Sequence, residues 1–235
     1  MHLFFEPYIT IDAQDFVLSE EESGHACRVL RLRIDDLLSI LDGKGNQFTC
    51  RITDPHPKKC KVEILSVHSE KESASSIHLA IAPTKNMERM EWLAEKVTEM
   101  GITHLTLLQC RNNERKHVKL DRLQRILISA MKQSQRLHLP KLDDLFHFND
   151  FVQSYPNGLI AHCSEGSKEP IQVLSKENKG PILIGPEGDF TKEEVDFALQ
   201  YGYKSITLGK NRLRTETAGL LVCAAAVLNS PFEIK

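Results

Sequence analysis

The stretch ILIGPEGDF, residues 182–190, places three aliphatic residues directly before two glycines, a proline and a carboxylate. A short aliphatic run bounded by Gly and Pro predicts a buried strand that ends near Gly185. Thr191 and Glu194 follow with the spacing of a capping box, so a helix is expected to begin there. The stretch therefore predicts a strand, a glycine-containing loop and a helix in close succession.

Strand and helix patterns alternate on both sides of this unit, from residue 77 onward. Strands are expected at 77–82, 103–110, 158–163, 181–185 and 204–209, and helices at 87–101, about 119–136, 191–202 and 217–228. This alternation predicts the α/β class, with a mostly parallel sheet that carries helices on both faces.

The N-terminal part of the chain has a different pattern, with short strands and a single helix. The expected elements are a helix at 20–31 after a Ser19/Glu22 capping box, a strand–turn–strand at 37–52 and a strand at 60–67. The polar stretch SEKESASS, residues 69–76, separates the two patterns because it has no apolar residue larger than alanine. We therefore expect two domains, 1–70 and 77–235.

Composition and missing motifs exclude several classes of protein. No apolar run reaches membrane-spanning length, and the first ten residues lack the pattern of a signal peptide. The six cysteines are scattered without a CxxC pair, so we expect reduced thiols in a cytoplasmic protein and no bound metal. Walker, GxGxxG, GxSxG and HExxH motifs are also absent.

A second expected strand also ends in a glycine loop, KSITLG followed by KNRLRTETA at residues 204–218. Ligands of open α/β sheets bind outside the carboxyl ends of the strands, where glycines allow the main chain to approach closely. Arg214 precedes the start of an apolar helix, whose N-terminus favours anions. Two such loops predict a ligand cleft, whereas either loop alone is equally well interpreted as a turn followed by an N-cap.

Basic residues gather in two stretches of a chain whose formal net charge is only −2. Residues 111–141 contain nine Lys or Arg against two acidic residues, and residues 24–33 contain three Arg and no acid. Together the two stretches favour a surface for a polyanion. For either stretch by itself, a solvated helix face is the simpler interpretation.

GPEGDF followed by LGKNRLRTETA resembles the paired motifs of the RsmE family, the SPOUT-class methyltransferases that modify uridine N3 in 16S ribosomal RNA. The segments 85–101 and 130–140 resemble that family's first catalytic helix and its Gln-x-x-Arg-x-x-x-Pro segment. HACRVLRLR and DDLLSILDGKG resemble its PUA-like N-terminal β-barrel. Asp189 departs from the family pattern, which has a second glycine there, and Asn211 and Arg212 replace a common Arg-Ile pair.

The resemblance implies a catalytic domain with a C-terminal trefoil knot that binds S-adenosylmethionine, after a PUA-like RNA-binding domain. The residues it implies for cofactor binding are Ile184, Gly185, Glu187, Gly188, Leu208, Gly209, Leu213, Arg214 and Thr215. It also implies a homodimer, in which the apolar helix at 217–228 is buried across a two-fold axis. Burial of this helix in the core of one chain is the alternative.

Methylation of uridine N3 requires loss of a proton and stabilisation of negative charge on the ring. We expect Arg214 to supply that stabilisation and Glu216 to act as the base or to orient Arg214. An interaction of Glu216 with the helix dipole is an equally supported interpretation.

The small ribosomal subunit is the implied partner, with contacts mainly to phosphate groups. The residues expected to bind RNA are Arg28, Arg31, Arg33, Arg111, Arg115, Arg122, Arg125, Gln133 and Arg136. Gln133 and Arg136 line the active site in an alternative interpretation. The alternative functions are methylation of another RNA or of ribose 2′-O, and a non-catalytic role in ribosome assembly.

Overall fold

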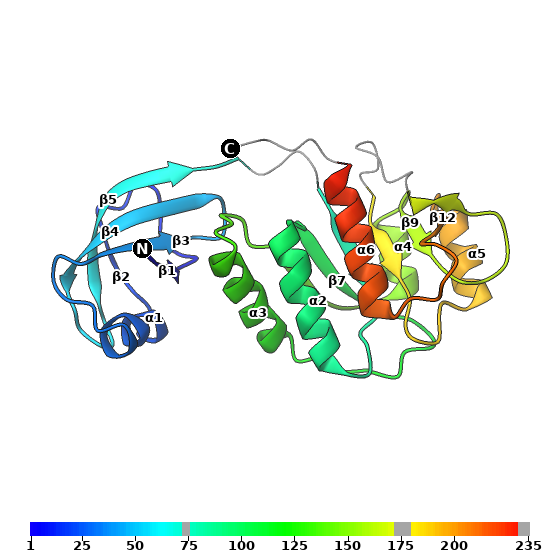
Figure 1. Cartoon of the computed structure of the whole chain (residues 1–235), viewed down its shortest axis with the longest axis horizontal. Coiled ribbons are helices and arrows are strands. Elements are labelled where there is room, and N and C mark those ends of the chain that lie inside the picture. Colours follow the sequence, from blue (N-terminus) through cyan, green and yellow to red (C-terminus); the bar gives the residue numbers. More distant parts are fainter. Residues whose placement is uncertain (72–75, 172–179, 230–235) are drawn as a thin grey trace. The chain divides into compact units, whose positions relative to one another are not determined.

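The computed structural model describes residues 1–71, 76–171 and 180–229 of the chain (Figure 1). The chain divides into two compact units. The first comprises Met1–Ser73 with Met131–Leu139, and the second comprises Ala74–Ala130 with Pro140–Lys235.

Residues 131–139, which the sequence predicts as part of the second domain, are grouped with the first unit instead. Met131 and Leu137 are buried against Leu41 in a small apolar cluster. Lys132 forms a 2.9 Å ion pair with Glu22. Apolar packing and a mostly buried ion pair thus attach this segment to the N-terminal strands, a tertiary contact that local sequence patterns do not encode.

The first unit is a five-stranded sheet with one short helical segment. Its elements are β1 (His2–Phe5), β2 (Asp15–Val17), α1 (Glu20–Gly24), the π-helical turn η1 (His25–Val29), β3 (Leu37–Leu41), β4 (Asn46–Asp54) and β5 (Lys61–Ser69). The strands lie in the order β1-β3-β4-β5-β2, and only the β1–β3 pair is parallel. Side chains that alternate along these strands, among them Phe4, Ile40, Phe48, Ile52 and Val62, form its core.

The predicted helix at 20–31 begins as expected and then changes geometry. The Ser19 hydroxyl accepts the backbone N–H of Glu22, which caps α1. After five residues the helix continues as η1, and Arg31 follows with a left-handed φ of 56°. The short strands β1 and β2 were not predicted.

The second unit is a seven-stranded sheet with helices on both faces. Its elements are β6 (His78–Ile81), α2 (Met87–Met100), β7 (His104–Gln109), α3 (Leu120–Gln133, whose last three residues belong to the first unit), β8 (Lys141–His147), α4 (Phe148–Ser154), β9 (Leu159–Ala161), β10 (Glu169–Pro170), β11 (Ile182–Ile184), α5 (Lys192–Gln200), β12 (Lys204–Thr207) and α6 (Thr215–Leu228). Every pairing in this sheet is parallel, which confirms the predicted α/β class. β8, α4 and β10 were not predicted.

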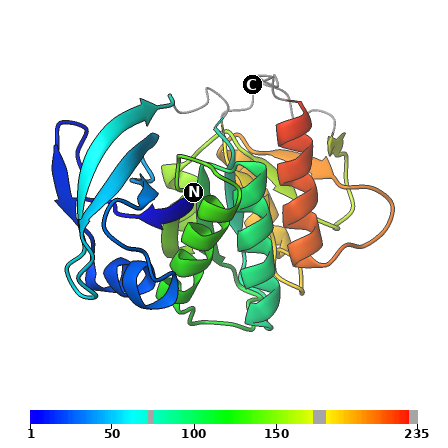
Figure 2. The same cartoon turned by 60° about the vertical axis from the view of Figure 1, so that its left-hand side comes forward.

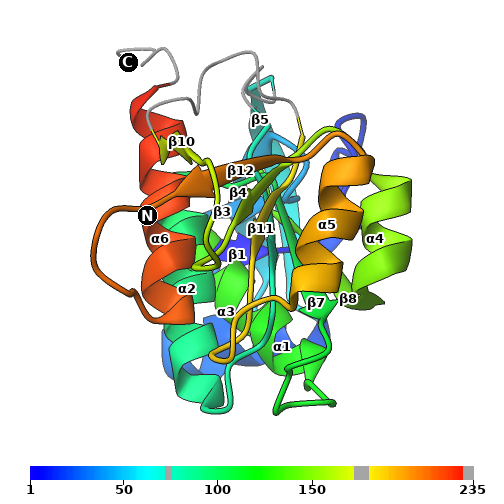
Figure 3. The same ribbon diagram turned by 90° about the vertical axis from the view of Figure 1, so that its right-hand side faces the viewer.

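Helices cover both faces of this sheet. Figure 3 shows α2 and α6 on one face and α4 and α5 on the other. α2 and α6 lie side by side in Figure 2, where the small Gly219 lets α6 approach Leu93 of α2 and Ile81 of β6 closely. No helix among the described residues is both long and apolar enough to span a bilayer.

The strand order of the second unit is β10-β12-β9-β11-β6-β7-β8, so β9 lies between β11 and β12. Because neighbouring parallel strands point the same way, the carboxyl ends of β9, β11 and β12 meet at one edge of the sheet. Three segments that are distant in the sequence therefore contribute their strand-end loops to a common place.

Candidate active site

A cavity of about 520 Å³ lies at the carboxyl ends of β9, β11 and β12. This volume falls in the range that encloses small-molecule ligands and cofactors. The lining residues come from the segments 161–168, 184–189 and 206–218. The predicted ligand cleft between two glycine loops is therefore present, with a third wall after β9.

The loop after β11 presents Glu187 to the cavity. One carboxylate oxygen of Glu187 accepts the backbone N–H of Lys85 at 2.9 Å, and Arg212 donates to the Glu187 backbone carbonyl at 3.2 Å. The other carboxylate oxygen is buried and has no hydrogen-bond partner among the described residues. A ligand hydroxyl or ammonium group would satisfy this acceptor.

Asp189 has a left-handed backbone, with φ of 65°, at the position where the resemblance implies glycine. Aspartate tolerates this conformation better than most side chains. Its carboxylate accepts the backbone N–H of Phe190 at 2.8 Å and that of Cys163 at 2.7 Å. Asp189 thus keeps the backbone geometry of a glycine and adds a link to the loop after β9.

The loop after β12 forms the facing wall. Gly209 has φ of 122°, and a Cβ added to it would meet nothing within 4 Å, so its main chain borders open space. The buried Thr215 hydroxyl donates a 3.1 Å hydrogen bond to the carbonyl of Gly185. This bond ties the first turn of α6 to the loop after β11.

Arg214 is the N-cap residue of α6, and its exposed side chain lines the cavity. It makes no side-chain hydrogen bond or ion pair with any residue that the structure describes. Its guanidinium is therefore free to meet negative charge at the cavity.

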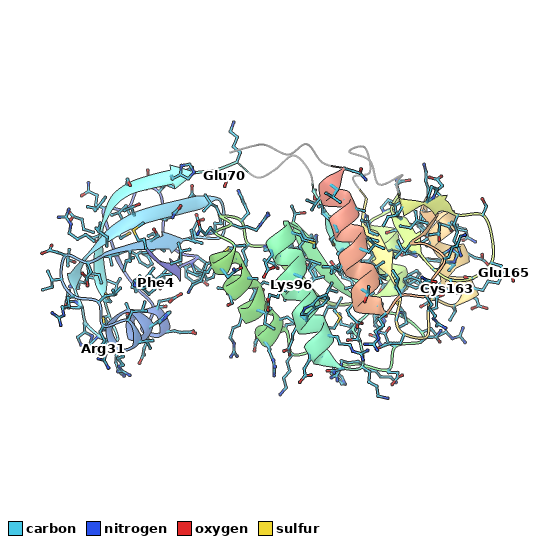
Figure 4. The ribbon with its side chains drawn as sticks, viewed as in Figure 1. Phe4, Arg31, Glu70, Lys96, Cys163 and Glu165 are labelled. Atoms are coloured by element: carbon cyan, nitrogen blue, oxygen red, sulfur yellow. The ribbon has the colours of Figure 1, made fainter. Side chains whose placement is uncertain are left out.

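The wall after β9 contains residues that were not predicted to belong to the site. Figure 4 labels Cys163 and Glu165 of this segment. The ring of His162 is held by hydrogen bonds to the hydroxyls of Ser164 and Ser205, both at 2.9 Å. Burial lowers the pKa of His162, and the positive charge of Lys168 lowers it further. The strand end at Cys163 was predicted, but its place between β11 and β12 was not.

Most of the residues expected to bind the cofactor line this one cavity. Gly188 is the exception. It is exposed, and its carbonyl accepts a hydrogen bond from Asn112 at 3.3 Å outside the cavity wall.

Glu216 is not part of the cavity wall. Its side chain is 8% exposed, and one carboxylate oxygen lies 3.7 Å from Nε of Arg89 on α2. The second oxygen is buried without a hydrogen-bond partner among the described residues. Glu216 therefore interacts with α2 and does not reach the cavity beside Arg214.

The residues expected to bind RNA are divided between the two units. Arg28, Arg31 and Arg33 are exposed on the first unit, and Arg111 and Arg125 are exposed on the second. Gln133 and Arg136 belong to the first unit, while the cavity belongs to the second. Gln133 is exposed, and burial lowers the pKa of the half-buried Arg136.

Two of the arginines on the second unit are engaged in contacts within the chain. Arg115 donates to the backbone carbonyl of Lys85 at 2.6 Å, beside the Glu187 contact. Arg122 forms a 2.6 Å ion pair with Glu91. Arg115 therefore supports the cavity wall, and Arg122 links α3 to α2.

A separate polar cluster lies at the amino ends of β6, β7 and β8, at the opposite edge of the sheet. The rings of His78 and His104 stack with centroids 3.8 Å apart. His104 bonds Asp143 at 2.5 Å, and His78 bonds Thr106 at 2.8 Å. The side chains of His78, His104 and Asp143 could also hold a metal ion, because one ligand atom of each lies within 4.8 Å of the others. In the structure they are hydrogen-bonded within the cluster.

Comparison with known proteins places these features in a family. Residues 71–227 match the model of the RNA methyltransferase domain, and residues 18–65 match that of the RNA methyltransferase PUA domain. A ribosomal RNA small subunit methyltransferase E of Rickettsia conorii is 31% identical over 212 residues, which cover 88% of this chain and 86% of the relative.

Solved structures agree over nearly the full length. A probable rRNA-methyltransferase from Porphyromonas gingivalis has a TM-score of 0.89 and 36% identity, covering 97% of this chain and 98% of the other. A ribosomal RNA small subunit methyltransferase E from Neisseria gonorrhoeae, bound to S-adenosyl methionine, has a TM-score of 0.81 and 29% identity, covering 96% of each chain.

The parallel sheet, the cavity at its strand ends and the N-terminal PUA domain together define an RNA methyltransferase of two domains. Relatives that match most of the chain share the name ribosomal RNA small subunit methyltransferase E. The chain belongs to the ribosomal RNA small subunit methyltransferase E family.

Proposed function

We propose that this protein transfers a methyl group from S-adenosylmethionine to N3 of a uridine in 16S ribosomal RNA. The observation that carries the proposal is the cavity at the ends of β9, β11 and β12, in a chain of the methyltransferase E family. Its relatives bear the name of small-subunit rRNA methyltransferases, and a neighbouring structure contains the cofactor.

The cavity has features that fit a nucleoside cofactor. The open space beside Gly209 admits a flat ring against the main chain. The unpartnered oxygen of Glu187 is an acceptor for a hydroxyl or ammonium group of the ligand. When bound, S-adenosylmethionine supplies an electrophilic methyl group on its sulfonium.

Arg214 is the residue that we assign to charge stabilisation on the uracil ring. N3 of uridine is protonated at neutral pH, so its nucleophilic form carries negative charge that the protein has to stabilise. Arg214 lines the cavity, is exposed, and has no partner within the described part of the chain. Its guanidinium is therefore available to the incoming uracil ring.

Glu216 fits a supporting role better than that of the base. Its nearest cation is Arg89 of α2, and its side chain is buried outside the cavity wall. A carboxylate in the first turn of α6 also interacts favourably with the positive end of the helix dipole. We assign Glu216 to positioning the N-terminus of α6, which carries Arg214.

The remaining assignments extend this proposal to the whole protein. We assign residues 1–70, with 131–139, to RNA binding through Arg28, Arg31 and Arg33. We assign the rest of the chain to methyl transfer to the small ribosomal subunit, in the cytoplasm. We also propose a trefoil knot in the C-terminal part and a homodimer. The apolar α6, with Leu221 36% exposed, supports the dimer.

The test incubates the purified protein with methyl-labelled S-adenosylmethionine and small ribosomal subunits from cells that lack it, with free 16S RNA as the second acceptor. Label in 3-methyluridine, absent with Arg214→Ala, supports the proposal. Label in another nucleoside contradicts the assigned target. Failure to bind the cofactor contradicts the enzymatic function itself and favours a non-catalytic role in ribosome assembly.

A further inference from the structure

Lys168 is a half-buried lysine in the wall of the cavity that follows β9. Its ammonium group makes no hydrogen bond or ion pair with any residue that the structure describes. By contrast, the more exposed Lys85 pairs with Glu114 at 2.8 Å. Because this half-buried ammonium has no counter-ion among the described residues, its position in the cavity wall favours an anionic ligand.

The neighbouring groups of this wall do not supply that anion. Lys168 lines the same cavity as His162 and Cys163. Its positive charge adds to burial in lowering the pKa of His162 and, together with Arg212, opposes the rise that burial causes in the pKa of Cys163. The lowered pKa of His162, due first to burial, keeps its ring neutral at pH 7. Burial raises the pKa of the Cys163 thiol, so it is neutral as well.

The carboxylate of Asp189, in the same cavity lining, is already engaged. The two carboxylate oxygens of Asp189 accept the backbone N–H groups of Cys163 and Phe190. These bonds hold the carboxylate against the main chain of both loops. The wall thus presents an ammonium group that forms no ion pair within residues 1–71, 76–171 and 180–229.

We propose that Lys168 binds the carboxylate of the methionine part of S-adenosylmethionine. This inference rests on the proposed function, because that cofactor is the assumed occupant of the cavity. Its carboxylate is its one anionic group, whereas its sulfonium and amino groups are cationic. The assignment sets the orientation of the ligand, with the amino acid end at the β9 wall and the nucleoside near Gly209 and Glu187.

The experiment compares two ligands that differ in the amino acid part. Titration calorimetry of the full-length protein measures the Kd of S-adenosylmethionine and of 5′-methylthioadenosine, which keeps the nucleoside and sulfur but lacks the carboxylate. The variants are Lys168→Met, Lys168→Arg and Lys204→Met. Lys204 serves as the matched control because it is an exposed lysine of β12 that does not line the cavity.

Lys168→Met is expected to weaken S-adenosylmethionine binding roughly five- to tenfold, the range of one charge-assisted hydrogen bond at a partly exposed site. Its affinity for 5′-methylthioadenosine is expected to stay within about twofold, since that ligand has no carboxylate. Lys168→Arg should retain most of the affinity, and Lys204→Met should change neither Kd.

Equal losses for both ligands would overturn the assignment, because they would indicate a general change of the cavity. An unchanged Kd for S-adenosylmethionine in Lys168→Met would overturn it too, as would an equal loss of affinity for S-adenosylmethionine in Lys204→Met. If Lys168→Met impairs only RNA binding, its partner is a phosphate of the RNA. Absence of cofactor binding by the unaltered protein would instead reject the proposed function.

Discussion

The carboxylate of Asp189 accepts the backbone N–H of Cys163 at 2.7 Å and thereby joins the loop after β11 to the loop after β9. The two residues are 26 positions apart in the chain but lie in loops that follow neighbouring strands of the sheet. The same side chain bonds Phe190, so one carboxylate fixes two walls of the cavity. This side chain replaces the glycine that the family resemblance implies at this position.

Replacing Asp189 by alanine is expected to destabilise the protein. The change removes two hydrogen bonds to backbone N–H groups and leaves a less tolerant side chain at φ of 65°, at a cost of about 1–3 kcal/mol. Asp189→Gly should cost less, because glycine accepts this backbone conformation. Urea unfolding measures both, and a more stable Asp189→Ala variant would contradict the role of the carboxylate.

Thr215→Val tests the link between the glycine loops. Valine keeps the shape of threonine but leaves the carbonyl of Gly185 without its hydrogen-bond donor, at a cost of about 1–3 kcal/mol. Thr215→Ser keeps the hydroxyl and is the matched control. We expect weaker S-adenosylmethionine binding in Thr215→Val than in Thr215→Ser by calorimetry, and equal affinities would show that this bond does not shape the cavity.

Arg214→Ala is expected to reduce methyl transfer by about 100-fold or more, the usual effect of losing one group that stabilises developing charge. Stability should change little, because the side chain has no partner within the described residues. Arg51→Ala, which alters a surface ion pair with Glu63, should leave transfer unchanged. Full methyl transfer by a folded Arg214→Ala protein would refute its role.

Glu216→Gln distinguishes a base from a positioning residue. Loss of a general base reduces turnover by about 100- to 10,000-fold, whereas a residue that only positions α6 tolerates the amide better. We expect turnover within about tenfold of the unaltered protein, together with a pH–rate profile of unchanged shape. Glu88→Gln, in the first turn of α2, is the control. A profile that loses its acidic limb, the fall in rate at low pH, would identify Glu216 as the base.

The stacked histidines predict a fall in stability at mildly acidic pH. Burial lowers the pKa of His78 from 6.5 to about 3, so the folded protein excludes a proton that the unfolded chain binds. The resulting stability is complete above about pH 6.5 and decreases as the pH falls toward 3, by up to about 1.4 kcal/mol per pH unit.

The measurement is urea unfolding of the unaltered protein and of His78→Gln at pH 7, 6 and 5. The variant should lose less stability than the unaltered protein between pH 6 and 5, because it lacks this titrating group. The exposed His117 has no partner among the described residues, so His117→Gln should keep the original pH dependence. Parallel curves for His78→Gln and the unaltered protein would contradict the buried, neutral state of His78.

The cavity was largely predictable because glycine loops after aliphatic strands have strong local signals. Gly185 and Gly209 each follow a buried or half-buried strand, and both line the cavity as expected. The alternation of strand and helix patterns along the chain also predicted the α/β class of the fold. These features depend on residues near each other in the sequence, which is why patterns detect them.

The missed features depend on tertiary order or on weak local patterns. β8 has an irregular burial pattern, and only the structure shows that it extends the sheet beside β7. His162 and Lys168 gained importance because β9 lies between β11 and β12, which the order of the strands along the chain does not reveal. The partner of Glu216 was missed for the same reason, since Arg89 lies on a helix 127 residues away in the sequence.

The central place of β9 also has a consequence for synthesis of the chain. Both neighbours of β9 follow it in the sequence, and β12 ends only at Thr207. A nascent chain that lacks these segments carries a strand with two unpaired edges, which invites pairing with other chains. The last strand to emerge from the ribosome therefore protects the protein from aggregation.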